Sequence, residues 1–262
     1  MNKEQTIEFL TKAANEHASD IFIIAGRPLA IKIDGHLSSY GDRLMPDQTE
    51  EILRCIYQMA HRNIDHLLSS GDDDFSFSIP GLSRFRINAY KQRGSLAAVI
   101  RVIAFQLPDP AELSIPEDVM SLAELTKGMV LVTGSAGSGK STTMACLIDR
   151  INHSREGHII TLEDPLEYLH KHDRCIVSQR EICTDTQSYL TSLRATLRQS
   201  PDVILLGEMR DYETIQTAMT AAETGHLVLS SLHTLGAANT ISRIMDVFEP
   251  SQQRLIAIQL SM

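Results

Sequence analysis

The sequence predicts an α/β protein whose two parts arrange their helices and strands differently. In residues 117–262, short apolar strands alternate with helical segments, which is typical of a parallel sheet covered on both faces. In residues 1–106, helices and short strands are mixed and are separated by tight turns. Residues 107–116 are rich in proline, which fixes φ and donates no backbone hydrogen bond. We therefore interpret residues 107–116 as a linker between two domains.

Within the first part, hydrophobic spacing and turn residues predict each element in turn. Helices are expected over residues 6–17 and 48–68, and strands over 21–24, 29–33, 75–79, 84–90 and 96–103. The last two strands should form a hairpin that turns at Arg93-Gly94. Asp72, Asp73 and Asp74 are expected to be solvated at the entry to a strand.

Within the second part, the same reading predicts strands over residues 128–133, 158–162, 203–206 and 227–231, and helices over 140–152, 186–198 and 212–223. Open α/β sheets bind their ligands outside the carboxyl ends of the strands. The residues that directly follow these strands are therefore the first candidates for a functional site.

Overall composition excludes several classes of protein. The 262 residues are 43% hydrophobic and 22% charged, which excludes a largely disordered or fibrous chain. The formal net charge of −9 argues against a nucleic-acid partner held by a basic surface. We predict no transmembrane segment, because no apolar run approaches ~18 residues, and no secretory signal. The four cysteines form no CxxC pair, so the sequence predicts no zinc ribbon. Scattered single thiols in a chain of this size indicate a reducing compartment.

Residues 134–141 read Gly-Ser-Ala-Gly-Ser-Gly-Lys-Ser and match the nucleotide-binding pattern G-x-x-x-x-G-K-[ST] between a strand and a helix. Such a loop turns backbone N–H groups toward phosphate oxygens, and the helix that follows adds its positive N-terminus. Lys140 is expected to reach the β- and γ-phosphates, and Ser141 to bind Mg²⁺. The predicted nucleotide-binding residues are Ser135, Ala136, Gly137, Ser138, Gly139, Lys140, Ser141 and Thr142.

Two glutamates are candidates for catalysis because each follows a strand. Glu208 comes after the strand 203–206 and one glycine, and we predict that it serves the metal side of the site as a second Mg²⁺ residue. Asp202 precedes that strand and is placed less well. Glu163 directly follows the strand 158–162, and we predict that it orients or deprotonates the attacking water. Without the phosphate loop, both glutamates would be interpreted as ordinary loop or turn residues.

A histidine stands at each end of the last predicted strand. His233 is at the carboxyl end with the other candidate residues, and we predict that it senses the phosphate. His226 is about 23 Å away along a straight strand of ~3.3 Å per residue, so the two histidines should not reach one phosphate. We expect a structural or interface role for His226.

The predicted hairpin places Arg86 opposite Arg101. Like charges that face each other across a sheet are destabilising, so an anion between them would explain the pair. The γ-phosphate on a neighbouring subunit is such an anion, and both arginines are therefore candidate catalytic residues that act in trans. The alternatives are that they act in cis or that both side chains extend into solvent.

Four motifs, in this order, resemble those of the secretion ATPase superfamily, and more closely those of the PilT-like type IV pilus retraction ATPases. They are Gly134–Thr143, Thr161–Tyr168, Asp202–Asp211 and Thr224–Thr234, which are similar to the Walker A, Asp box, Walker B and His box of that family. The N-terminal part also resembles the family, at Ala18–Asp20, Gly26–Pro28, Asp34-Gly35, Arg84–Asn88 and Arg93-Gly94.

The resemblance implies a PAS-like α+β domain over residues 1–106 and a RecA-like P-loop NTPase domain over residues 117–262. It further implies an ATP-hydrolysing motor for pilus retraction and twitching motility, with ATP and Mg²⁺ as cofactors. The subunits of this family form a hexameric homo-oligomer in the bacterial cytoplasm, peripheral to the inner membrane, and dock on a platform protein of the pilus. The nucleotide would lie between the domains, with arginines supplied across a subunit boundary.

The chain departs from the family pattern at three places. The first strand reads Ser-Asp-Ile-Phe over residues 19–22, where the family usually has His. Ser135-Ala136 stands where the family usually has Pro-Thr, but both residues remain small. The chain ends at Met262, whereas the family continues through further helices, so the resemblance implies a C-terminally truncated chain or a short variant. The tetracysteine zinc insertion common in extension and type II secretion ATPases is not in the sequence.

Two other functions stay open on the sequence. One is a nucleotide-binding regulatory or structural ring subunit without motor activity, and the intact Glu163 and Glu208 argue against it. The other is a secretion, conjugation or DNA-uptake ATPase of the same superfamily, which would have the same ATP site and different partners.

Overall fold

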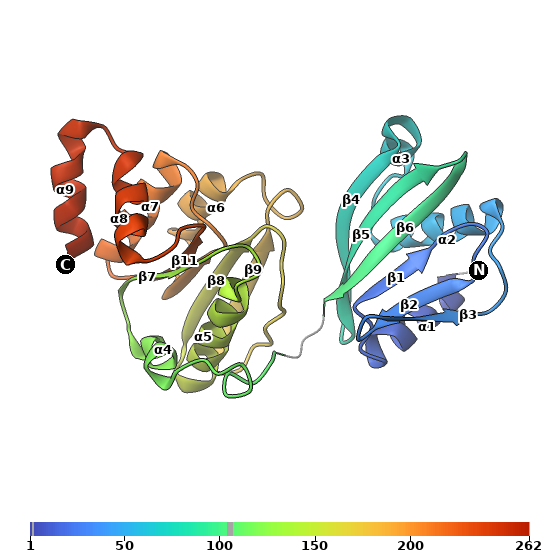
Figure 1. Ribbon diagram of the computed structural model, residues 1–262, viewed down its shortest axis with the longest axis horizontal. Helices are drawn as coiled ribbons and strands as arrows, with labels where there is room; N and C mark the ends of the chain where they lie inside the picture. The colour runs from blue at the N-terminus through green and yellow to red at the C-terminus, as the bar shows by residue number, and fades with distance from the viewer. Residues whose placement is uncertain (2, 104–106, 262) are drawn as a thin grey trace. The chain divides into compact units, whose positions relative to one another are not determined.

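The computed structural model describes residues 1, 3–103 and 107–261 (Figure 1). Contacts between Cα atoms divide the chain into two compact units, Met1–Phe105 and Gln106–Met262. The boundary predicted after residue 106 lies outside the described residues. The predicted linker, residues 107–116, forms turns and contains neither helix nor strand.

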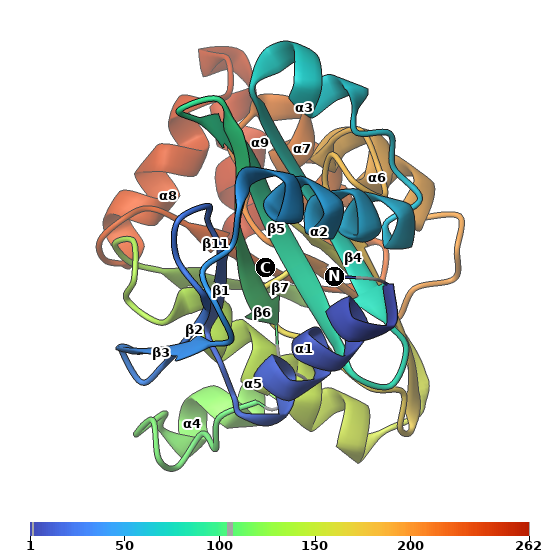
Figure 2. The same cartoon turned by 90° about the vertical axis from the view of Figure 1, so that its right-hand side faces the viewer.

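The first unit is an antiparallel sheet with helices packed on one face, as Figure 2 shows for α1 and α2. The strands lie in the order β3-β2-β1-β6-β5-β4. Their bounds are β1 (Asp20–Ile23), β2 (Leu29–Ile33), β3 (His36–Tyr40), β4 (Asp72–Ile79), β5 (Ser83–Gln92) and β6 (Ser95–Ile103), and the helices are α1 (Lys3–Asn15), α2 (Pro46–Met59) and α3 (Asp65–Ser70). Alternate residues of the central strands, such as Phe85 and Ile87, are fully buried against the helices.

The predicted hairpin register is confirmed, because Arg86 of β5 lies opposite Arg101 of β6 and Gln92 opposite Ser95. The edge strand β3 was not predicted, because its sequence His-Leu-Ser-Ser-Tyr is almost entirely exposed and shows no apolar face.

The single helix predicted over residues 48–68 is wrong, because the chain forms α2 and α3 with a break between them. His61 adopts a φ of 51°, in the left-handed region that a helix does not permit. The break allows Arg62 to turn toward the sheet and to contact Asp73 of β4. The left-handed backbone at His61 thus separates α2 from α3, although the hydrophobic period continues in the sequence.

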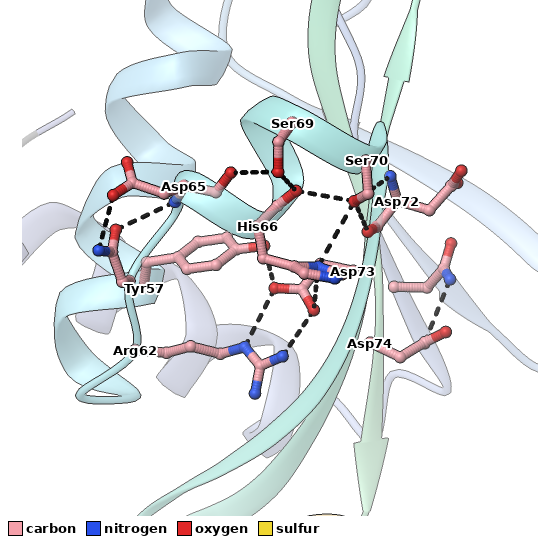
Figure 3. Close-up of polar contacts among 11 residues, drawn as sticks. Tyr57, Arg62, Asp65, His66, Ser69, Ser70, Asp72, Asp73 and Asp74 are labelled. Carbon is pink, nitrogen blue, oxygen red and sulfur yellow. Dashed lines mark hydrogen bonds and ion pairs between the residues drawn. The ribbon is translucent and has the colours of Figure 1, made fainter.

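Asp73 is the centre of a buried polar cluster rather than the solvated residue predicted from the sequence (Figure 3). Its side chain is only 2% exposed. Arg62 donates through Nε and Nη2 (3.0 and 2.7 Å), and the hydroxyl of Tyr57 donates to Oδ2 (2.9 Å). Burial alone raises the pKa of Asp73, but the hydrogen bonds from Arg62 and Tyr57 outweigh it and hold that pKa below its ordinary value. The cluster joins α2, the break and β4.

Asp73→Asn should lower the free energy of unfolding by about 2 kcal/mol at pH 7, because it removes the charge that pairs with Arg62 and leaves the buried Tyr57 hydroxyl with a weaker acceptor. A carboxyl whose pKa is lowered by folding adds stability above its unfolded pKa and loses it as the pH falls through its folded pKa. The difference from the parent should therefore shrink only below pH ~4. Urea unfolding against pH measures it, with the exposed neighbour variant Asp72→Asn as a control that should have little effect at pH 7.

The second unit confirms the predicted parallel sheet. Its five strands lie in the order β7-β11-β10-β8-β9, and every pair is parallel. The strands are β7 (Gly128–Thr133), β8 (Gly157–Glu163), β9 (Cys175–Glu181), β10 (Val203–Leu206) and β11 (Leu227–Leu232). The helices are α4 (Glu117–Met120), α5 (Lys140–Ser154), α6 (Tyr189–Thr196), α7 (Tyr212–Glu223), α8 (Ala237–Asp246) and α9 (Pro250–Ser261), with a 3₁₀ turn at Ser121–Glu124.

Two hydrophobic clusters cover the two faces of this sheet. Val203 and Leu205 of β10 pack with residues of α5, whereas Ile204 and Leu206 pack with residues of α6 and α7. Figure 1 shows the sheet between α5 and these other helices. Successive residues of one strand thus pack into the hydrophobic clusters on opposite faces of the sheet, which explains why these strands are continuously apolar.

The strand β9 and the helices α8 and α9 were not predicted from the sequence. The strand β9 begins with three apolar residues, Cys-Ile-Val, and continues with four polar ones, Ser-Gln-Arg-Glu, so neither an alternation nor a long apolar run marks it. Among the described residues, none of the helices combines the length and apolar character needed to cross a membrane.

Candidate functional site

The predicted phosphate loop connects β7 to α5, with Lys140 as the first residue of the helix. The loop is tightly folded at its start. A Cβ atom at Gly134 would lie 2.5 Å from the Ser138 hydroxyl oxygen, so a side chain at this position would have to displace the Ser138 side chain. The Lys140 side chain turns back over the loop, and its Nζ donates to the carbonyl oxygens of Gly134 (3.1 Å) and Ser135 (2.8 Å).

A cavity of about 260 Å³ lies beside this loop, at the carboxyl edge of the parallel sheet. Its lining brings together most of the predicted site residues: Ala136, Gly137, Lys140, Ser141, Glu163, Glu208 and His233. Ser135, Ser138 and Gly139 belong to the loop without lining the cavity, and the Thr142 hydroxyl is hydrogen-bonded to the Tyr168 hydroxyl (3.0 Å). The strand order alone achieves this convergence from residues far apart in the sequence.

Glu163 is the last residue of β8, and its carboxylate is held by two side chains. Oε1 accepts hydrogen bonds from the Thr161 hydroxyl (2.6 Å) and from Nε2 of Gln179 (3.4 Å). Burial raises the pKa of Glu163 to about 7, although these hydrogen bonds act in the opposite direction. A carboxyl group that is half ionised near neutral pH is suited to accept a proton.

Glu208 lies beyond β10 and faces two basic side chains. Arg210 forms an ion pair with its Oε1 at 2.5 Å, and the ring nitrogen Nε2 of His233 is 3.7 Å from Oε2. The Glu208 side chain is 12% exposed, whereas His233 is 56% exposed and accessible from the cavity. The hydrogen bond to Glu208 raises the pKa of Arg210. This arrangement holds the Glu208 carboxylate against a guanidinium group beside the cavity.

Gly207 allows β10 and β8 to approach closely at the site. A Cβ atom there would lie 2.8 Å from the Tyr189 hydroxyl oxygen and 3.4 Å from the Cα of Glu163. A side chain at Gly207 would therefore displace the Tyr189 hydroxyl, and its Cβ would reach van der Waals contact with the Glu163 backbone.

His226 and Asp202 lie at the opposite, amino edge of the sheet. The ring nitrogen Nδ1 of His226 is 2.9 Å from the carbonyl oxygen of Ala221 in the last turn of α7. Asp202 accepts the backbone N–H of His158 through Oδ2 (2.8 Å). Both contacts tie adjacent segments together, so a structural role explains His226 within this chain, and an interface role stays a prediction.

Arg86 and Arg101 lie in the first unit, on the outer face of its sheet. Arg101 is paired with Asp20 of β1, whose Oδ1 accepts from its Nε (3.3 Å), and its side chain is 63% exposed. Asp20 thus supplies part of the negative charge that the sequence argument assigned to an external anion. A cavity of about 300 Å³ remains between the two arginines and their neighbours Asp20, Asp74, Asn88 and Val99.

The sequence reasoning missed several side chains that belong to the site, among them Thr161, His170, Gln179, Tyr189 and Arg210. Thr161 could have been found, because residues two apart on a strand share a face. Gln179 could not, because its strand was not predicted. Arg210 stands two residues after Glu208 in a loop, and no periodic pattern places its side chain.

Comparisons with known proteins agree with this geometry. The family model described as type II/IV secretion system protein matches residues 3–261. A type IV pilus retraction ATPase, PilT of Pseudomonas aeruginosa, is 41% identical over 258 residues, which cover 97% of this chain and 74% of that protein. A twitching motility protein of Neisseria gonorrhoeae is 48% identical over 188 residues, or 72% of this chain and 50% of that protein.

Among solved structures, the pilus retraction motor PilT with bound ADP superposes with a TM-score of 0.85 at 46% identity. The match covers 97% of this chain and 74% of that chain, so the likeness extends over both units. The predicted fold class, a PAS-like α+β domain followed by a RecA-like ATPase domain, is confirmed. The chain belongs to the family of type II/IV secretion system proteins.

Proposed function

We propose that this chain is an ATP-hydrolysing subunit of a hexameric motor that retracts type IV pili and so drives twitching motility. The observation that carries the proposal is the cavity at the carboxyl edge of the parallel sheet. It combines the phosphate loop, through Lys140 and Ser141, with Glu163, Glu208 and His233. Two relatives that are similar to this chain in sequence are named a type IV pilus retraction ATPase and a twitching motility protein.

The residues around the cavity fit a nucleoside triphosphate with Mg²⁺. Within the described residues, the Lys140 ammonium group donates to the backbone carbonyl oxygens of Gly134 and Ser135, and it can exchange these for phosphate oxygens. The Ser141 hydroxyl and the Glu208 carboxylate, which both line the cavity, are oxygen ligands of the kind that Mg²⁺ prefers. When bound, Mg²⁺ would neutralise charge on the phosphates.

In the proposed hydrolysis each residue has a defined task. Lys140 binds the β- and γ-phosphates, and His233 stands where it can contact the γ-phosphate. Glu163 orients the attacking water and accepts its proton on the carboxylate. Glu208 serves the metal side and is held in place by Arg210.

Glu163→Gln should leave nucleotide binding largely intact and slow hydrolysis by a factor of ~10² or more, the scale of a lost general base. Because the pKa of Glu163 is raised to about 7, the parent rate should fall as the pH drops through this value and the carboxylate is protonated. The glutamine variant should lose this acidic limb. Single-turnover hydrolysis and nucleotide binding, each measured against pH, test both statements. Weaker binding with an unchanged hydrolysis step would contradict the assignment.

A cellular measurement tests the motor function with the same variant. In this test, a gene that encodes the Glu163→Gln variant replaces the native gene in its host. Pili should still extend but should accumulate on the cell surface, and twitching should cease. Normal retraction by cells that make the stable variant would reject the retraction function. In this proposal the ring works in the cytoplasm against an inner-membrane platform protein of the pilus, as the family resemblance implies.

The alternative of a ring subunit without motor activity is less well supported, because both catalytic glutamates line the cavity. A secretion or DNA-uptake ATPase would have the same site, and normal pilus retraction combined with defective protein or DNA transport would favour it.

A further inference from the structure

The side chain of Gln179 connects the Glu163 carboxylate to the chain segment that follows β8. Its Nε2 donates to Glu163 Oε1 (3.4 Å) and to the carbonyl oxygen of Tyr168 (2.9 Å). Its Oε1 accepts the backbone N–H of His170 (2.7 Å). Gln179 lies on β9 directly opposite Thr161 of β8, and Thr161 donates to the same oxygen of Glu163 (2.6 Å). Two neighbouring strands thus present donors to one carboxylate oxygen.

The backbone of residues 168–170 determines which way the Gln179 amide faces. An amide oxygen can only accept hydrogen bonds and an amide nitrogen can only donate them. The oxygen faces the N–H of His170 and the nitrogen faces the carbonyl of Tyr168. A flipped amide would place two donors together and two acceptors together. The remaining N–H is therefore directed at Glu163.

The same segment contacts the helix of the phosphate loop. The Tyr168 hydroxyl is 3.0 Å from the Thr142 hydroxyl, in the first turn of α5 and next to Ser141. His170 lines the cavity itself. The first turn of α5 is therefore linked to Glu163 by hydrogen bonds at the hydroxyl and at the backbone carbonyl of Tyr168, and by the side chain of Gln179.

We propose that Gln179 is a positioning residue for ATP hydrolysis, holding the Glu163 carboxylate in its ionised form and directed at the water beside the γ-phosphate. This inference rests on the function proposed above. Gln179 acts through Glu163 and through the backbone that it binds, and it does not line the cavity. Gln179 supplies a second hydrogen-bond donor to Glu163 Oε1, in addition to the hydroxyl of Thr161.

Glu163 needs such donors because its surroundings disfavour a negative charge. Burial is the main cause that raises its pKa, and the nearby carboxylate of Glu167 adds to it. Glu181 lies opposite Glu163 on β9. The other charged or titratable groups around the same cavity are Lys140 on α5, Asp164, Glu167 and His170 after β8, Tyr189 on α6, Glu208 and Arg210 after β10, and His233 after β11.

The decisive variant is Gln179→Met, which keeps the length of the side chain and removes both donors. We expect kcat to fall about tenfold with little change in the KM for ATP, the scale of one lost hydrogen bond to a charged group. The acidic limb of the kcat profile should move to higher pH, because the ionised form of Glu163 loses a donor. Gln179→Glu, which still accepts the His170 N–H, should move the limb further, because it replaces the donor with a second carboxylate.

A double-mutant cycle separates positioning from a general structural effect. In a Glu163→Gln background, Gln179→Met should cause no further loss, because its partner carboxylate is already gone. Losses that multiply would show that Gln179 only stabilises the fold, and would overturn the proposal. Gln216→Met, on the exposed face of α7, is the matched control and should keep the parent rate and pH profile.

The outcomes distinguish this inference from the proposed function. If the parent protein has no ATPase activity that depends on Lys140 and Glu163, the function itself fails. If the parent hydrolyses ATP and depends on Glu163, but Gln179→Met and Gln179→Glu keep the parent rate and acidic limb, only the positioning role is rejected. Thermal unfolding of each variant shows whether the substituted chain is folded at the assay temperature.

Discussion

Lys140→Ala should abolish ATP hydrolysis and strongly weaken nucleotide binding. The Lys140 residue is only 8% exposed, and its ammonium group is already held over the phosphate loop by the carbonyl oxygens of Gly134 and Ser135. Of the other basic side chains that line the described cavity, Arg210 is paired with Glu208, and burial lowers the pKa of His170 to about 4, which leaves the exposed His233. Removing Lys140 therefore removes the main positive charge available to the β- and γ-phosphates.

Binding of a fluorescent nucleotide and release of phosphate measure the two effects of Lys140→Ala separately. Lys127→Ala is a suitable control. Lys127 is an exposed residue of the same unit, and its replacement removes the same charge. Turnover by Lys140→Ala close to the parent value would reject the assignment of the phosphate loop.

Arg86→Ala should lower the rate of hydrolysis by ~10³-fold or more, the contribution of an arginine that stabilises charge on the transferred phosphoryl group. Arg86 belongs to the first unit and the phosphate loop to the second. We expect Arg86, with Arg101, to act on the nucleotide of a neighbouring subunit. The specific activity of the parent should then rise with protein concentration, because the complete site forms only in the assembled ring.

Mixing inactive subunits tests this arrangement directly. Arg86→Ala subunits mixed with Lys140→Ala subunits should regain part of the activity, because some interfaces combine an intact arginine with an intact phosphate loop. Arg54→Ala, an exposed arginine of α2, is the control and should behave as the parent. Co-assembled variants that regain nothing would show that Arg86 acts in cis or not at all. Constant activity from a demonstrated monomer would exclude a shared site.

The elements that the sequence predicts most closely are those with clear signals at both ends. For α7, the predicted helix 212–223 has the observed bounds, and Asp211 caps it by accepting the N–H of Thr214 (2.9 Å). The strand β10 is likewise predicted at its observed bounds, because it is apolar throughout and is followed by a glycine. The residues of each element and its immediate neighbours determine its bounds, so the sequence alone predicts them.

The errors concern residues whose environment is set by distant parts of the chain. Asp73 is buried because Arg62 and Tyr57 reach it from α2 and the break that follows. Its two neighbours in sequence are exposed, so no local signal distinguishes it from them. The same holds for the surroundings of Glu163. The end of β8 predicts where its carboxylate lies, but the position of its partner Gln179 depends on the pairing of β8 with β9. Spacing thus identifies reacting groups more readily than the groups that hold them.

The two edges of the parallel sheet have a consequence for how this protein can change over time. Glu163, Glu208 and His233 stand at one edge, whereas Asp202 and His226 fasten adjacent segments at the other. These two sets of residues lie at opposite ends of the same strands. We therefore expect substitutions at the amino edge to change the stability of the unit more than the geometry of the reacting groups, so that the two properties can be altered separately.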